Sequence, residues 1–437
     1  MLSIDSAEFA HRRSRILDAM QEGSALLVPT NTEQMRSNDT DFRFRPASDF
    51  YYLCGFPEPK AWALLRKGLP GPSFVLFVQP KDPAREVWTG IRAGVGGAVE
   101  QFGADEAFSV DELDSKLGEL LSPANKLYFS FGRQAQHEDR VNDILGKIRR
   151  SRKATLGPSC IEDSTAFLAE FRLFKSAAEL AVMREGARIT AEAHTLAMQQ
   201  VRPGMFEYEI DALLEYTFRR QGAWAPAYTS IVGGGANACI LHYIENNSKF
   251  GPNDLMLIDA GAEVDGYATD VTRTSPVSGK FTTPQADLYN AVLRAQEEAI
   301  IQTRPGATIE GIHNGVVRNL CESMVDLGLL EGSVDQLVET EAYKRFYMHR
   351  TSHWLGIDVH DVGRYKLTSG EERPLEPGMV LTIEPGIYVA PDDELAPKLF
   401  RGLGIRIEDD ILVTSSGHEN LTAATPKTIA QIEALRS

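Results

Sequence analysis

Short apolar runs separated by Gly and Pro characterise the first part of the chain. The segments Ser24–Val28 (SALLV), Ala61–Leu65 (AWALL) and Phe74–Val78 (FVLFV) are typical of buried strands. Val110–Leu121 instead places its apolar residues at helical spacing, between charged positions. This part of the chain is therefore predicted to be a mixed α/β domain, and it carries few obvious chemical groups.

A longer helical pattern begins at Ser176 and keeps an apolar stripe for about seven turns. It ends before Pro203–Gly204, a pair that cannot continue a helix. Two further helices are predicted at Asp211–Gln221 and Ala286–Thr303, with Gly-rich, strand-like segments between them. Because 437 residues exceed what one core usually supports, we expect an α+β protein with two domains, residues 1–174 and 175–437.

Two ten-residue segments in the second domain resemble each other. Pro252–Gly261 (PNDLMLIDAG) and Pro377–Gly386 (PGMVLTIEPG) each run from proline into an apolar strand. Each strand ends in an acid, Asp259 or Glu384, that stands two residues before a glycine. They are either two independent buried strands with loop glycines, or parts of a duplicated α/β unit in which each half delivers a carboxylate to a shared cleft.

Composition and charge exclude several classes of protein. A formal net charge of −16 argues against nucleic-acid binding, because no basic field exists to release counterions from phosphates, and it also disfavours anionic membranes. No signal peptide and no bilayer-spanning apolar run is evident. The four cysteines lie far apart without CxxC pairing, as expected of buried thiols in a reducing compartment. We therefore expect a cytoplasmic protein.

The pair Asp265–Gly266 is a strong signal for a two-residue hairpin turn. Such a turn pairs Val264 with Tyr267 and places Asp259 on the same face as Asp270, as its diagonal neighbour. Each aspartate alone could simply cap a turn. Two carboxylates on one face in an apolar setting repel each other unless a positive charge lies between them.

Two more carboxylates come from the C-terminal part of the chain. Glu384 ends the apolar run Met379–Ile383, where a buried charge is costly without a partner. In Gly404–Thr414, strand alternation places Arg406 and Glu408 on one face and two isoleucines on the other. By itself, an Arg–Glu pair of this kind would indicate only a surface salt bridge.

Histidines are concentrated near these acids. The chain has nine, and three of them fall within Met348–Gly363, namely His349, His353 and His360, while His242 lies in CILHYIENN. No HExxH pattern is present, which excludes a zincin-type helix site. Four carboxylates and one imidazole suit a pair of divalent ions, Mn²⁺, Co²⁺, Fe²⁺ or Zn²⁺, and paired ions of this kind activate water for hydrolysis.

Several motifs together resemble a known family: HYIENN, LIDAG with GYATDVTRT, SHWLGIDVHDVG, LTIEPGIY and GIRIEDD. They are similar to the metallopeptidases that include aminopeptidase P, prolidase and methionine aminopeptidase. The resemblance, which covers residue 175 to the end, implies a pita-bread fold with two α/β halves. The N-terminal motifs RSNDTDFRFRPASDFYYLCGF and EVWTGIR also resemble aminopeptidase P, which narrows the expectation to an Xaa-Pro aminopeptidase or a prolidase.

The resemblance also implies roles for individual residues. Two divalent ions, with Mn²⁺ preferred over Zn²⁺, Co²⁺ and Fe²⁺, would be held by Asp259, Asp270, His353, Glu384 and Glu408. Glu384 would also act as general base, and His360 and His242 would stabilise the oxyanion and assist protonation of the leaving nitrogen. Substrate contacts are expected from His349, Arg406, Tyr388, Trp88 and Asp39. For Arg406, a salt bridge that orients Glu408 is an alternative role that can coexist with a substrate contact.

The same resemblance implies a homo-oligomer, a dimer or tetramer, in which Asp39 and Trp88 reach a neighbouring subunit's site. The expected substrates are proline-containing peptides. Prolidase activity, a non-catalytic peptide-binding protein and a creatinase-like hydrolase remain as alternatives. Arg350–Thr351 and Arg364–Arg373 depart from the forms usual in the family, which leaves the preferred substrate length open.

Overall fold

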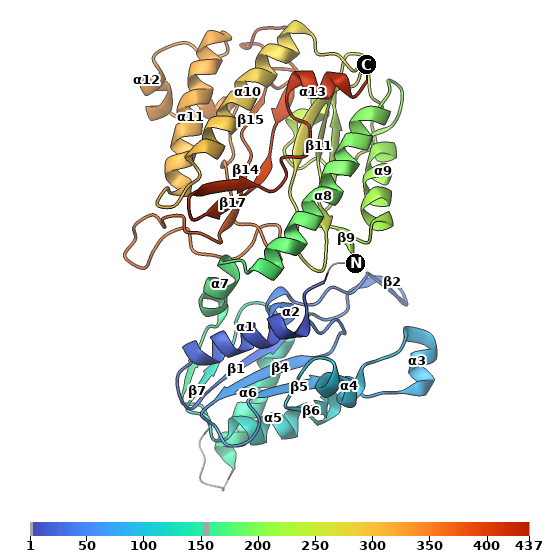
Figure 1. The fold of residues 1–437 in the computed structure, drawn as a ribbon, viewed down its shortest axis with the longest axis vertical. Coiled ribbons are helices and arrows are strands. Elements are labelled where there is room, and N and C mark those ends of the chain that lie inside the picture. The colour runs from blue at the N-terminus through green and yellow to red at the C-terminus, as the bar shows by residue number, and fades with distance from the viewer. Residues whose placement is uncertain (1–2, 152–156, 437) are drawn as a thin grey trace. The chain divides into compact units, whose positions relative to one another are not determined.

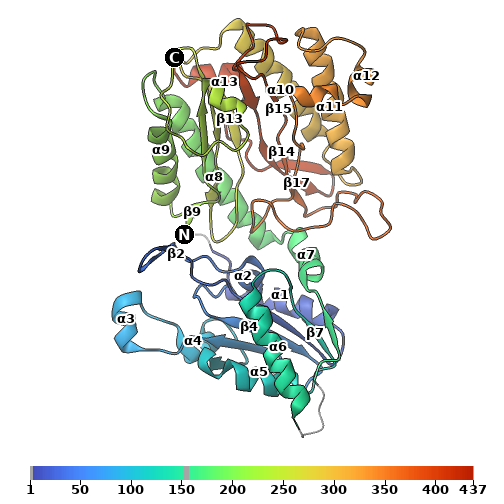
Figure 2. The same cartoon turned by 180° about the vertical axis from the view of Figure 1, so that it is seen from behind.

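The computed structural model describes residues 3–151 and 157–436. They form two compact units, one made of residues 4–172 and the other of the chain from Leu173 onward (Figures 1 and 2). Both units mix helices and strands, so the α+β class is confirmed. Among the described helices, none combines the length and the apolar character that crossing a bilayer requires.

The N-terminal unit is built on one sheet with the strand order β6-β5-β4-β1-β7-β8. The strands are β1 (Ser24–Pro29), β4 (Trp62–Lys67), β5 (Phe74–Val78), β6 (Glu106–Ser109), β7 (Lys126–Tyr128) and β8 (Cys160–Glu162). The three strands predicted from apolar runs are β1, β4 and β5, which pair antiparallel at the centre of the sheet. The outer pairings, β5 with β6 and β1 with β7 and β7 with β8, are parallel.

Helices cover both faces of this sheet. Figures 1 and 2 show α1 (Ser6–Ala19) on one face and α5 (Leu113–Leu121) with α6 (Ala135–Arg150) on the other. Leu64 and Phe77 of the sheet share a core with Leu117 of α5. The predicted helix at 110–121 is confirmed as α5 preceded by the 3₁₀ turn η1 (Val110–Glu112). Shorter elements are β2 (Met35–Ser37), β3 (Thr40–Asp41), α2 (Ser48–Cys54), α3 (Pro83–Thr89), α4 (Gly94–Glu100) and α7 (Thr165–Leu173).

In the C-terminal unit, two helix pairs flank the strands. The pairs are α8 (Ala177–Gln200) with α9 (Glu207–Arg220), and α10 (Thr283–Gln302) with α11 (Ile309–Asp326), as Figure 1 shows in green and gold. The long predicted helix is α8, and a capping box between Ser176 and Glu179 fixes its start. Smaller helices are η2 (Gly235–Cys239), α12 (Val334–Glu339), η3 (Ala342–Arg345) and α13 (Ile429–Ala434).

Each helix pair is followed along the chain by an antiparallel sheet. The first sheet contains β10 (Ile231–Gly234), β11 (Leu255–Asp259) and β13 (Thr272–Pro276), and the second contains β14 (Val380–Ile383), β17 (Asp409–Thr414) and β18 (Gly417–Asn420). Two-stranded pairs add β9 (Ala225–Pro226) with β12 (Ala262–Glu263), and β15 (Gly386–Tyr388) with β16 (Gly404–Arg406). This repeated order favours the duplicated unit over two unrelated strands.

The glycines of the two similar segments occupy equivalent tight positions. A Cβ atom at Gly261 would lie 1.6 Å from the carbonyl oxygen of Thr269, and one at Gly386 would lie 2.7 Å from that of Ile405. Any side chain would therefore push the neighbouring backbone away. Glycine at these positions allows a second segment of the chain to pass close beside the acid that ends β11 or follows β14.

The predicted hairpin forms with the expected register. Asp265 and Gly266 both have positive φ, 47° and 80°, as a type I′ turn requires. Val264 and Tyr267 exchange two backbone hydrogen bonds of 2.9 Å. The same register continues into β11 and β13, from the pair of Asp259 with Thr272 to that of Leu255 with Pro276.

Candidate metal centre

The hairpin brings Asp259 and Asp270 to one point. Asp259 ends β11, and Asp270 lies just before β13. The hydroxyl oxygen of Tyr228 is 2.6 Å from Oδ1 of Asp259 and 2.5 Å from Oδ1 of Asp270. The two carboxylates therefore converge on one face, as the hairpin register predicted.

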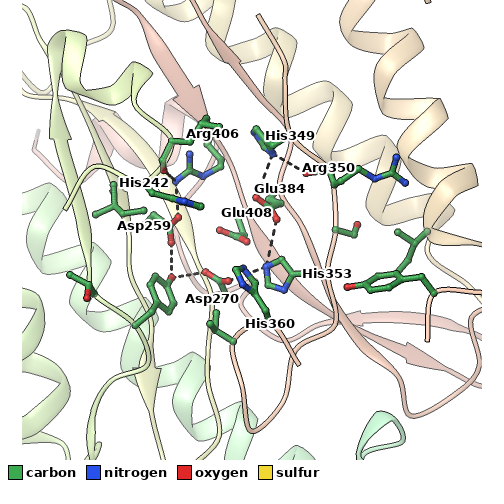
Figure 3. A pocket seen from close by; sticks show the side chains of 18 of the residues that line it. His242, Asp259, Asp270, His349, Arg350, His353, His360, Glu384, Arg406 and Glu408 are labelled. Atoms are coloured by element: carbon green, nitrogen blue, oxygen red, sulfur yellow. Dashed lines mark hydrogen bonds and ion pairs between the residues drawn. The ribbon is translucent and has the colours of Figure 1, made fainter. Parts of the chain in front are cut away.

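The second half of the unit adds the remaining acids and one histidine. Nε2 of His353 lies 3.3 Å from Oδ2 of Asp270 and 3.6 Å from Oε1 of Glu384. Asp270, His353 and Glu408 each offer one ligand atom, and these atoms all lie within 4.8 Å of one another. We call the following five residues the pocket cluster, whose side chains gather between the two halves (Figure 3): Asp259, Asp270, His353, Glu384 and Glu408.

Four of the five residues in the pocket cluster are acids, and their carboxyl groups are difficult to ionise together. Burial, followed by the charges of Asp270 and Asp259, raises the pKa of Glu384 to about 7. Burial and the surrounding carboxylates hold the pKa of Glu408 well above its ordinary value. Burial also raises the pKa of Asp259. A cation is needed before all these groups can be charged at neutral pH.

His353 and Asp270 are coupled in the opposite sense. Burial alone would lower the pKa of His353, but its hydrogen bond to Asp270 and the charge of Glu384 raise that pKa to about 9. Burial alone would raise the pKa of Asp270, but the hydrogen bond from His353 lowers it. The protonated histidine therefore supplies part of the positive charge that the neighbouring carboxylates need as a partner.

These residues fit a pair of divalent ions. Four carboxylates face one arginine, Arg406, whose Nη2 donates a 2.6 Å hydrogen bond to Oδ2 of Asp259. The donor set is rich in oxygen, with one imidazole, and it lies in a cavity of about 890 Å³. Such a set suits hard to intermediate divalent cations, and it lacks the thiolates typical of structural zinc sites.

The other predicted site histidines line the same pocket. His242 and His360 are exposed on its wall, and the ring of His360 stands at 85° to that of His353 with their centroids 4.4 Å apart. Burial and the charge of His353 lower the pKa of His360, which favours its neutral form. Nε2 of His349 lies 2.9 Å from the hydroxyl of Tyr388, and burial lowers the pKa of His349 to about 3.

Arg406 has a different carboxylate partner from the one expected. Its guanidinium donates to Asp259 and to the hydroxyl of Tyr388, and it reaches Glu408 only through Thr272. The hydroxyl of Thr272 donates a 2.7 Å hydrogen bond to Oε2 of Glu408. The long arginine side chain extends across to the end of β11, so the salt bridge considered as its alternative role is formed with Asp259 and not with Glu408.

Sequence reasoning missed Tyr228 and Thr272. Tyr228 follows the two-residue strand β9 and belongs to no recognisable pattern, so no sequence signal identifies it. Thr272 could have been found from the hairpin, because it lies opposite Asp259 in the predicted register. Both residues supply hydroxyl groups that hold carboxylates of the pocket cluster in place.

Asp39 and Trp88 belong to the N-terminal unit. Asp39 lies in the turn between β2 and β3, where its side chain is exposed, and Trp88 in α3 is 87% exposed. Their expected contact with a neighbouring subunit stays a prediction.

Comparison with known proteins gives matches along the whole chain. Residues 181–415 match the model of metallopeptidase family M24, and residues 9–128 match that of the aminopeptidase P N-terminal domain. The chain is 45% identical to an Xaa-Pro aminopeptidase of Escherichia coli (strain K12), covering 100% of this chain and 98% of the relative. It is 33% identical to human Xaa-Pro aminopeptidase 3, covering 99% and 86%.

Solved structures give the same result. The Pseudomonas aeruginosa aminopeptidase PepP superposes with a TM-score of 0.98 at 46% identity, covering 100% of this chain and 98% of the other. Zinc-substituted E. coli aminopeptidase P in complex with product superposes with a TM-score of 0.96 at 45% identity, covering 99% and 98%.

Proposed function

The chain belongs to metallopeptidase family M24, and from this membership we propose that it is an Xaa-Pro aminopeptidase. It would hydrolyse the bond between an N-terminal residue and a following proline. One observation carries the proposal: five potential ligands from distant segments converge in one pocket of a chain that resembles aminopeptidase P from end to end.

We assign the five residues of the pocket cluster as ligands of two divalent ions. Asp259 would bind one ion, Asp270 and Glu408 would bridge the two, and His353 with Glu384 would complete the other site. When bound, the ions would act as Lewis acids and make a water molecule nucleophilic at neutral pH. Manganese is our preferred metal, and zinc-substituted E. coli aminopeptidase P supports the use of divalent ions in this fold.

Glu384 is proposed as the general base that takes the proton from the attacking water. A glutamate carboxylate that the bound cations keep ionised can accept that proton, because it lies in the same pocket as the other ligands.

His242 and His360 are proposed to act on the leaving group, the proline nitrogen. The nitrogen of a bond to proline carries no N–H, so it leaves poorly unless it is protonated. Both imidazoles reach the pocket, where they can stabilise the oxyanion and assist delivery of that proton. His349 and Arg406 line the pocket where we place further substrate contacts, and Tyr388 is buried behind them, bonded to both.

We also propose that the protein is a cytoplasmic homo-oligomer. The buried thiols of Cys54 and Cys321 suit a reducing compartment. Trp88 is accompanied in the N-terminal unit by Val87 and Ile91, whose exposed fractions are 81% and 86%, and apolar side chains this exposed suit contact with another copy. Under this proposal Asp39 and Trp88 complete the site of a neighbouring subunit.

The proposed activity is tested with an Xaa-Pro-Yaa tripeptide and the manganese-loaded protein. The expected result is release of the N-terminal amino acid, and much slower cleavage of the matching peptide that has alanine in place of proline. A prolidase would hydrolyse the Xaa-Pro dipeptide and leave the tripeptide intact, which would overturn the proposal.

A further inference from the structure

The loop that carries two of the site histidines has little secondary structure of its own. Between Phe346 and Trp354 the backbone forms no helix or strand, yet it presents both His349 and His353 to the pocket. Such a loop must be held by individual hydrogen bonds. Arg350 and Thr351 lie at the centre of this loop.

Thr351 joins this loop to the strand end that bears Glu384. The backbone N–H of Glu384 donates a 2.9 Å hydrogen bond to the carbonyl oxygen of Thr351. A second bond, from the N–H of Thr382 to the carbonyl of His353, runs beside it at 3.0 Å. The position of the Thr351 backbone therefore determines where Glu384 leaves β14.

The side chain of Thr351 is fully buried and lies between two other buried polar groups. Its hydroxyl oxygen is 2.8 Å from Nδ1 of His313, on α11, and 2.7 Å from the hydroxyl of Tyr347. These contacts link the loop to a helix of the second half and to the residue that begins the loop. Figure 3 shows His349, Glu384 and His353 together on the pocket side of this loop.

One arrangement of protons satisfies all three groups. The Tyr347 hydroxyl donates to Thr351, whose own hydroxyl donates to Nδ1 of a neutral His313. Burial lowers the pKa of His313 to about 4, so the imidazole is neutral near pH 7. Thr351 is the only member that both accepts and donates within this set, so removing its hydroxyl leaves two buried polar groups unpaired.

We propose that Thr351 is a positioning residue for Glu384: its buried hydroxyl, held by His313 and Tyr347, fixes the carbonyl that anchors the Glu384 backbone. The inference rests on the proposed function, because it assumes that Glu384 acts on metal and water. Small displacements of a catalytic group reduce turnover strongly, since the reaction needs the group at a defined place.

The test compares Thr351→Val, which keeps the shape and loses the hydroxyl, with Thr351→Ser, which keeps the hydroxyl. For the valine variant we expect kcat and the affinity for Mn²⁺ each to fall about tenfold, at the low end of what loss of an outer partner of a ligand costs. KM should change little, and the serine variant should recover most of both losses. Manganese affinity is measured by calorimetry on metal-free protein, so one readout does not depend on activity.

Thr303→Val is a matched control. Thr303 is fully buried in the same unit, and its hydroxyl donates only to the carbonyl of Ala299, away from the pocket-lining residues. This variant should lose stability while its kcat and manganese affinity stay at the wild-type values. If Thr351→Val behaves like Thr303→Val, with a lower melting temperature alone, the inference is wrong.

A second pair of variants covers the case in which Thr351→Val does not fold. His313→Leu removes the partner of the Thr351 hydroxyl, and His313→Asn keeps a polar atom near the place of Nδ1. We expect kcat and the affinity for Mn²⁺ to fall in His313→Leu and to recover in His313→Asn. Equal values of both quantities in the two variants would overturn the inference. A wild-type protein that leaves Xaa-Pro peptides uncleaved would instead refute the proposed function.

Discussion

Two adjacent residues of one segment, Glu408 and Asp409, belong to very different buried environments. Glu408 faces the pocket cluster, where carboxylates outnumber positive groups. Asp409 points the other way, into a set of partners that we call the Asp409 network: Arg273, Gln296, Thr422 and Lys427. The pKa of Glu408 is raised and that of Asp409 is lowered. Both acids are at most 1% exposed, so burial alone does not explain why their pKa values move in opposite directions.

The Asp409 network neutralises its charge internally. Oδ1 of Asp409 accepts hydrogen bonds from Arg273 at 2.6 Å and Thr422 at 2.9 Å, and Oδ2 accepts from Gln296 and Lys427, both at 2.8 Å. Burial would raise the pKa of Asp409, but the charges of Arg273 and Lys427 hold it far below its ordinary value. In the pocket cluster, in contrast, the pKa values of Asp259, Glu384 and Glu408 are raised. A buried acid with complete protein partners is structural, whereas a group of acids without them requires a cation from solution.

The largest expected effect comes from Glu384→Gln, which keeps the size of the side chain and removes its ability to accept a proton. We expect kcat for an Xaa-Pro-Yaa tripeptide to fall by about 10²- to 10⁴-fold, the usual contribution of a general base. Steady-state kinetics of the manganese-loaded protein measures this. Glu419→Gln, at an exposed acid paired with Arg184, is the control and should retain activity. An unchanged rate in Glu384→Gln would rule out its role as base.

Asp409→Asn should destabilise the Asp409 network. The change leaves the buried charges of Arg273 and Lys427 without their anion, and we expect unfolding to become easier by about 3–5 kcal/mol. Urea denaturation measures the change. The folded variant should still bind manganese. Loss of metal binding at unchanged stability would show that Asp409 works with the pocket cluster.

Metal addition should distinguish the two environments directly. Manganese at about 100 times its dissociation constant should stabilise the wild-type protein by about 2.7 kcal/mol for each ion bound. Asp409→Asn should show the same gain, whereas Glu408→Gln, which lacks one proposed bridging carboxylate, should show much less. Thermal denaturation with and without the metal gives both values. A full gain in Glu408→Gln would remove Glu408 from the ligand set.

A smaller effect concerns the pH dependence of the metal-free protein. The pKa of Glu384 is raised to about 7 from 4.5, so between these values the folded chain keeps a proton that the unfolded chain has lost. Because the folded chain retains this proton, the free energy of unfolding falls as pH rises from 4.5 to 7, by on the order of 1 kcal/mol or more. Glu384→Gln should make this slope shallower, because it removes the contribution of Glu384 while Asp259 and Glu408 keep theirs. A free energy that rises over this range, with no difference between wild type and variant, would contradict the assignment.

Asp409 should contribute with the opposite sign. Its folded pKa is lowered, so its stabilising effect is present above the ordinary pKa of 3.8 and is lost as the pH falls below that value. Comparing the acid limb of unfolding in wild type and Asp409→Asn isolates this contribution. Glu384 and Asp409 would thus be separated by the pH range in which each affects stability.

Local patterns in the sequence predicted the features that depend on neighbouring residues. The strands β1, β4 and β5, the helix α8 and the turn at Asp265–Gly266 follow from apolar spacing, caps and turn chemistry. The hairpin register then placed Asp259 beside Asp270 before any tertiary information was used. The ligand set itself came from residue types together with the family resemblance.

Features that join distant segments were not predictable in this way. Tyr228 approaches Asp259 and Asp270 only because the chain folds back after β9, and no periodic pattern marks it. Likewise, nothing in the sequence connects Asp409 with Arg273, 136 positions away. The alternative role of Arg406 named Glu408 as its partner and not Asp259, because sequence alternation indicates a face but not how far a long side chain extends.

The hydroxyl of Tyr228 has a consequence for how the site is loaded. It carries a single hydrogen, yet it lies within 2.6 Å of one oxygen of each aspartate, so it can donate to only one of them at a time. The other short contact requires a second hydrogen, which Asp259, with its raised pKa, can carry. Cation uptake must then expel that hydrogen into the medium. The heat measured on titration with manganese should accordingly vary with the ionisation enthalpy of the buffer.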